Sequence, residues 1–101
     1  GGEPFVEVVQ VQSGPTATER PLDIGIPYPP SLRSAGHEAD IRIRVTVDAA
    51  GKVVGVDYLH SSGHGAVDAE VLQRIREHLF AAEDESSTVD VVVRFRLERP
   101  F

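Results

Sequence analysis

Residues 41–48 alternate strictly between apolar and polar side chains, and this pattern constrains the fold of the chain most strongly. Successive side chains of a β-strand point to opposite faces, so a segment with this pattern must bury one face. The alternation returns in residues 88–97. The positions that we expect to face the core are Ile41, Ile43, Val45, Val47, Val89, Val91, Val93, Phe95 and Leu97.

Between these two segments the spacing of apolar residues changes to that of a helix. The helix is predicted over residues 66–82, and its apolar residues are Val67, Val71, Leu72, Ile75 and Leu79. A shorter helix is predicted over residues 30–35, because prolines stand at its start and Gly36 follows its end.

A hairpin turn is predicted directly after the first alternating segment. Asp48 favours a turn, and Gly51 can take the positive φ that such a turn needs. The chain then enters a second strand at residues 52–60. We expect this strand to place Val54, Val56 and Tyr58 on one side.

The N-terminal part of the chain carries a further strand signal. Residues 5–12 are rich in β-branched side chains, but Val8 and Val9 fall on opposite faces, so neither face is clearly the buried one. Residues 13–30 contain five prolines and two glycines, which predicts an extended connector. The strand could pair with a free edge of its own sheet, swap into a neighbouring molecule, or occupy a peptide groove as an autoinhibitor.

The charge balance limits the classes of partner. Sixteen acidic and ten basic side chains give a net charge of −6 at pH 7. This charge repels nucleic acid and anionic lipid surfaces, so we expect no nucleic-acid partner. The chain has no cysteine, which excludes disulfides, thiolate chemistry and cysteine-based zinc sites.

Two groups of polar residues invite an enzyme or metal-site interpretation. His60 and His64 could approach a metal, but zinc sites take three or four ligands and the chain has no HExxH pattern. Ser62, His64 and Asp68 could suggest a hydrolytic triad, but the G-x-S-x-G elbow is absent. These residues more simply form a turn and cap a helix. We therefore expect no catalysis, no metal and no cofactor.

Three local motifs together resemble one family, the C-terminal domain of TonB-type and TolA-like energy transducers. Tyr28-Pro29, followed by the short helix that Gly36 closes, is similar to the entry motif of the family. Gly51-Lys52-Val53 is similar to its hairpin. Ser61-Ser62-Gly63, followed by Val67-Asp68, is similar to its joint between strand and helix.

The resemblance implies an α+β fold in two layers. A three-stranded antiparallel-type sheet would carry one main helix and a short N-terminal helix on one face, with a possible extra N-terminal strand. The last strand, residues 88–97, would lie at an edge beside the first strand of the hairpin. We divide the chain accordingly into an N-terminal strand with a Pro-rich connector, residues 1–27, and the family-like domain, residues 28–101.

The resemblance also implies a function, that of a periplasmic interaction module in a trans-envelope energy-transducing system. Its partner would be an extended peptide of an outer-membrane receptor or another envelope protein, bound by β-strand addition to the last strand. The predicted partner-binding residues are Ile26, Tyr28, Pro29, Val89, Val91, Val93, Arg94, Phe95 and Arg96. The full-length chain would be anchored in the inner membrane and linked to a motor complex there. The domain itself would be a monomer or a strand-swapped dimer.

Other interpretations remain open from the sequence. The same fold could serve as an adaptor in a trans-envelope motility or secretion machine, and a small metal-dependent or hydrolytic enzyme is the alternative from another class. Tyr28 could simply pack over the sheet. Four arginines of the outward sheet face could bind an acidic partner segment or peptidoglycan, or could form a solvated face, and these are Arg42, Arg44, Arg94 and Arg96.

Overall fold

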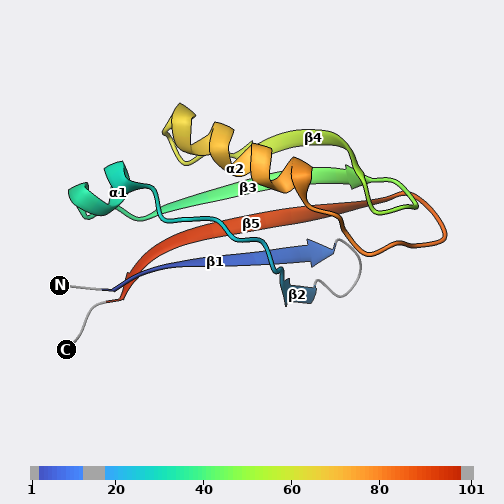
Figure 1. The fold of residues 1–101 in the computed structure, drawn as a ribbon, viewed down its shortest axis with the longest axis horizontal. Helices are drawn as coiled ribbons and strands as arrows, with labels where there is room; N and C mark the ends of the chain where they lie inside the picture. The colour runs from blue at the N-terminus through green and yellow to red at the C-terminus, as the bar shows by residue number, and fades with distance from the viewer. Residues whose placement is uncertain (1–2, 13–17, 99–101) are drawn as a thin grey trace.

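The computed structural model describes residues 3–12 and 18–98, which form one antiparallel sheet and two helices (Figure 1). The elements are β1 (Glu3–Gln12), β2 (Thr18–Pro21), α1 (Pro30–Ala35), β3 (Ala39–Val47), β4 (Val53–His60), α2 (Gly65–Glu77) and β5 (Ser87–Glu98). The sheet has five strands in the order β2-β1-β5-β3-β4. The α+β class is confirmed, but the sheet is larger than the three strands predicted.

The hydrophobic core lies between the sheet and the two helices. The helices contribute Leu32, Val67, Val71 and Ile75. The alternating strands meet them as predicted, with Ile41 opposite Val93, Ile43 opposite Val91 and Val45 opposite Val89 in the β3–β5 register. All six of these strand residues are buried, which confirms the inward faces of both segments.

The turn between β3 and β4 forms as the sequence predicts. The Asp48 carboxylate accepts hydrogen bonds from the backbone N–H of Ala50 at 3.0 Å and of Lys52 at 2.9 Å. Gly51 takes a φ of 93°, a conformation that strains residues with a Cβ. The short helix α1 also occupies the predicted residues, and Gly36 ends it with a φ of 69°.

The prediction for Val54 is wrong. The register shifts by one residue between Thr46 and Val47, so Val53 rather than Val54 stands opposite Val47. A bulge of this kind turns the extra side chain out of the alternation. Val53 and Val56 consequently pack against the core, whereas Val54 is 62% exposed.

Helix α2 ends at Glu77, before the predicted end at Ala82. Beyond it, the backbone N–H of Phe80 donates to the Gly51 carbonyl at 2.9 Å, and that of Glu83 donates to the Ala49 carbonyl at 3.0 Å. These bonds hold the chain against the β3–β4 turn in a non-helical path. Phe80 is thereby buried, while Leu79, the last apolar residue of the predicted helical spacing, is exposed.

The N-terminal strand is part of the sheet, since β1 lies between β2 and β5. Val8 packs into the core beneath the helices, and Val9, on the other face, is also buried. This double burial explains why the sequence did not distinguish the two faces. The predicted connector contains β2, and its residues 13–17 lie outside the described part of the chain.

Candidate peptide-binding site

The last strand, where the sequence predicts the partner to bind, lies in the interior of the sheet (Figure 1). β5 pairs with β3 on one side and with β1 on the other. The β1 register runs over nine positions, from Glu3 opposite Glu98 to Val11 opposite Asp90. The expectation that residues 88–97 form a sheet edge is therefore wrong, because the chain's own first strand occupies that edge.

The predicted β5 residues divide between the two faces of the sheet. Val89, Val91, Val93 and Phe95 are buried beneath the helices. Arg94 and Arg96 alternate with them and lie on the opposite face, where each meets a carboxylate. Only the two arginines offer accessible side chains, so any strand that pairs with β5 meets the other four mainly through their backbone.

Arg94 joins β5 to both N-terminal strands. Its guanidinium lies against the Glu7 carboxylate of β1 and 3.1 Å from the Glu19 carboxylate of β2. The hydrogen bonds that Arg94 donates to Glu19 and Glu7 raise the pKa of Arg94, and the same bonding lowers the pKa of Glu19. This ion triplet is the polar contact that fastens the β1–β2 hairpin to the last strand.

The predicted residues before α1 pack against the other end of β5. The Tyr28 ring meets the Phe95 ring edge to face, with centroids 5.4 Å apart, and its hydroxyl donates to the His37 carbonyl at 2.5 Å. Burial, together with the charge of Glu38, raises the pKa of Tyr28. Ile26 and Pro29 are buried. Tyr28 thus holds the segment before α1 over the end of the sheet.

The four outward arginines do share one face, but acidic side chains neutralise them. Arg42 and Arg44 both bind Asp90, at 2.7 and 2.9 Å, and Arg96 lies 2.7 Å from Asp40. Burial acts to raise the pKa of Asp90, but the hydrogen bonds from the two arginines outweigh burial and leave that pKa lowered. Because Arg94 is also paired, this face is a lattice of ion pairs rather than a basic stripe.

The residues that could suggest a hydrolytic triad form the start of α2 instead. The Asp68 carboxylate accepts the backbone N–H of Ser62 at 3.0 Å and the hydroxyls of Ser61 and Ser62. Burial acts to raise the pKa of Asp68, but these bonds leave it lowered. The Ser62 hydroxyl is therefore committed to a carboxylate. Across residues 3–12 and 18–98, no group of three or more His, Cys, Asp or Glu side chains is placed to hold a metal ion.

Sequence reasoning missed the acidic partners of Arg94. Glu7 and Glu19 come from strands that are far from Arg94 in sequence, and only the pairing of β1 with β2 and β5 brings them together. The sequence held a weak signal for this contact: Glu7 and Val9 are two residues apart, so their side chains lie on the same face of the first strand. The signal could not be used while the faces of that strand were undetermined.

Comparison with known proteins gives one match. The profile of a family described as the Gram-negative bacterial TonB protein C-terminal matches residues 25–97. No curated protein and no solved structure matches the chain significantly. In the part of the chain that the structure describes, no helix is long and apolar enough to cross a membrane.

Proposed function

Because the chain belongs to the family of TonB C-terminal domains, we propose that it binds an extended segment of an outer-membrane partner by β-strand addition to β5. As a member of this family, the chain is a TonB-like interaction domain of a periplasmic energy-transducing system. The family consists of interaction domains, not of enzymes. We also propose that the partner is an outer-membrane receptor and that the full-length chain is linked to an inner-membrane motor.

One observation carries the choice of β5. The family match covers residues 25–97, in which the strand order is β5-β3-β4 with β5 at the end. β1 and β2 lie outside the match and cover that end. The pairing of β1 along nine positions of β5 is itself an example of the strand addition that we propose for the partner.

In this proposal the partner segment takes the place of β1. Each backbone hydrogen bond that the segment forms contributes about 0.5–1.5 kcal/mol, so five or six bonds, after ordering costs, correspond to roughly micromolar affinity. The free energy of releasing β1 weakens the observed affinity further, because only the open state can bind. β1 therefore acts as an internal competitor.

The predicted residues take distinct roles. Val89, Val91, Val93 and Phe95 would present their backbone to the partner while their side chains stay in the core. Release of Glu7 and Glu19 would free Arg94 for an acidic side chain of the partner, since it is their ion pairs that now occupy it. Ile26, Tyr28 and Pro29 would support the end of the site beside Phe95.

A reversible cross-link between β1 and β5 tests the exchange. Val9 stands opposite Val92, and opposed residues of antiparallel strands lie within disulfide range. We expect reduced Val9→Cys/Val92→Cys protein to bind ten-residue peptides from the periplasm-facing N-terminal segments of the source bacterium's outer-membrane receptors. The oxidised protein should bind them at least about tenfold more weakly, a difference of about 1.4 kcal/mol. Fluorescence anisotropy with labelled peptides measures both affinities.

A second disulfide provides the control. Thr46→Cys/Thr88→Cys joins β3 to β5 at opposed residues and leaves β1 free to move. The natural chain has no cysteine, so each variant carries only the engineered pair. Equal affinity in the oxidised and reduced states of the β1–β5 pair would overturn the proposal, and so would an equal loss in the control pair.

A further inference from the structure

We propose that the free edge of β4 and the adjoining side of α2 form a second docking groove, for an extended protein segment that carries an acidic side chain opposite Arg76. This groove is separate from β5 and does not require the release of β1. The proposal is independent of the strand exchange above.

The two outer edges of the sheet differ in their protection. β2 is four residues long, all of them exposed, and it carries Glu19, Arg20 and Pro21. Charges, proline and short length are the features that keep a sheet edge from pairing. β4 is eight residues long and contains no proline. Among the described strands no partner covers its outer side, so the regular stretch Gly55–Tyr58, between the two register shifts, remains competent to accept a strand.

Exposed apolar side chains accompany this open edge. Val54 is 62% exposed and Leu59 is 44% exposed. The register of β4 shifts at both ends, at Val54 and at Leu59, whereas Gly55–Tyr58 between them pair regularly with β3. A guest strand would therefore find a regular stretch of backbone with aliphatic side chains at both ends.

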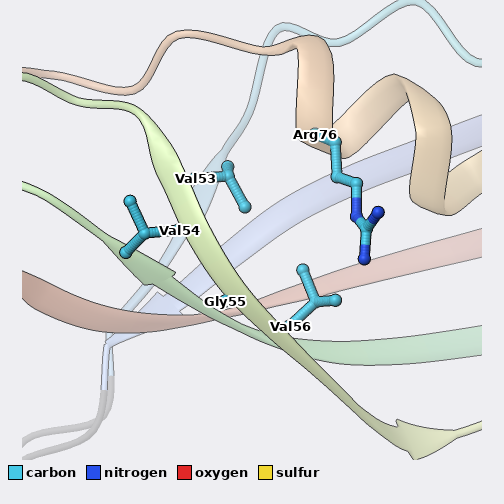
Figure 2. Close-up of a pocket in the computed structure, with 5 residues that line it drawn as sticks. All are labelled: Val53, Val54, Gly55, Val56 and Arg76. Atoms are coloured by element: carbon cyan, nitrogen blue, oxygen red, sulfur yellow. The ribbon is translucent and has the colours of Figure 1, made fainter.

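A hollow lies along the same edge and ends at a cation (Figure 2). Residues 53–56 and Arg76 line a cavity of about 310 Å³. Figure 2 shows Arg76 reaching from α2 toward Val56, with Val53 on the same side of β4 and Val54 on the other. A side chain that projects from a strand added beside β4 would enter the space below this guanidinium.

A second hollow of about 320 Å³ adjoins Arg76 on the outer side of α2. Ala69 and Leu72 line it with apolar surface, and Gln73 and Glu77 complete the lining. Leu72 also packs against the core. The face of α2 that carries Arg76 thus offers an apolar area beside charged side chains. A strand edge flanked by a helix is a recurring way to hold an extended peptide, because the backbone bonds the edge and alternate side chains enter the groove.

The charge of Arg76 identifies the chemistry of the guest. Arg42, Arg44, Arg74, Arg94 and Arg96 each lie within 4 Å of a carboxylate. Arg76, like Arg20, Arg33 and Lys52, forms no such pair with any residue in the described ranges, but it alone of these four lines the hollow beside β4. A guest carboxylate would supply the missing partner and would be favoured over a neutral or basic side chain.

Three peptides of one length test the groove. The probes are Ac-SVTVEVTS-NH2 and the versions with Gln or Lys in place of Glu, titrated into ¹⁵N-labelled protein. We expect the Glu peptide to shift amide signals of residues 53–60 and of the adjoining side of α2, and to bind about tenfold more tightly than the Gln peptide. Arg76→Glu should remove this preference and favour the Lys peptide. Arg33→Glu, the same charge change on α1, should leave the preference unchanged.

Oxidised Val9→Cys/Val92→Cys protein separates this site from β5. The Glu peptide should bind the locked protein as it binds the natural one, whatever the outcome for receptor peptides. Shifts confined to β1 and β5, equal effects of the two arginine variants, or absence of β4 shifts at about millimolar peptide would overturn the proposal. Dimerisation through β4 without peptide, detected by sedimentation, would also overturn it, because a second copy would then be the occupant.

Discussion

At the scale of single residues, Gly51 joins two parts of the molecule that are distant in sequence. It has the positive φ of the β3–β4 turn, and its carbonyl accepts the N–H of Phe80. A Cβ at this position would lie 2.1 Å from the Phe80 carbonyl oxygen. The turn and the segment after α2 therefore depend on one glycine for both conformation and space.

Gly51→Ala should lower the free energy of unfolding by about 3 kcal/mol or more, because strain and a backbone clash act together. Gly63→Ala is the matched control, since Gly63 also has a positive φ of 86° but a Cβ added there would meet no atom within 4 Å. The control should cost only about 1–2 kcal/mol, which is the conformational part. Urea unfolding followed by circular dichroism measures both, and equal losses would refute the close approach of Phe80.

Asp90 is the second residue whose contribution to stability can be measured. It is buried on the outward face and bound by Arg42 and Arg44. Its pKa is lowered in the folded state, so its stabilising contribution is fully present above the unfolded pKa of about 4 and is lost as the pH falls through the folded pKa. Asp90→Asn should therefore destabilise the protein by about 1–3 kcal/mol at neutral pH.

The difference in stability between the natural protein and Asp90→Asn should shrink as the pH is lowered from about 6 to about 2. Urea midpoints across this range provide the measurement. Asp84→Asn, in the exposed loop before β5, should change stability little at any pH. A difference for Asp90→Asn that is constant with pH would argue against its ion pairs as the source.

At the scale of elements, local patterns predicted what local forces determine. The alternation in β3 and β5, the turn at Asp48 and the cap at Gly36 each depend on neighbouring residues, and each formed as expected. The end of α2 did not, because Phe80 bonds to the distant Gly51. The helical spacing of apolar residues continues to Leu79, but α2 ends at Glu77 because tertiary hydrogen bonds redirect the chain beyond it.

The largest error, the position of β5 in the sheet, also came from a long-range contact. β1 is paired with residues 79 to 95 positions away, from Val11 with Asp90 to Glu3 with Glu98, and its two apolar faces gave no parity that could orient it. The ion pairs of the outward face share this origin, since Asp90 and Arg42 are 48 residues apart. The sequence could identify candidate binding residues in β5, but it could not show that β1 pairs with β5 and covers its backbone.

At the scale of the whole molecule, the sheet combines a family part with an added part. β5, β3 and β4 lie within residues 25–97, apart from the last residue of β5, and β1 and β2 extend the sheet beyond them. The molecule is elongated, 46 by 28 by 20 Å, and β1, β5 and β3 run along its longest dimension (Figure 1). A guest in the place of β1 would lie along the same direction.

Native-state hydrogen exchange tests the central claim, that β1 is a replaceable occupant of the β5 edge. Strands that open locally exchange with a lower free energy than strands that open only on global unfolding. We predict that β1 amides exchange at a free energy at least about 2 kcal/mol below that of the β3–β5 ladder. If β1 and the β3–β5 ladder exchange with the same free energy, β1 is an integral strand and the exchange account is wrong.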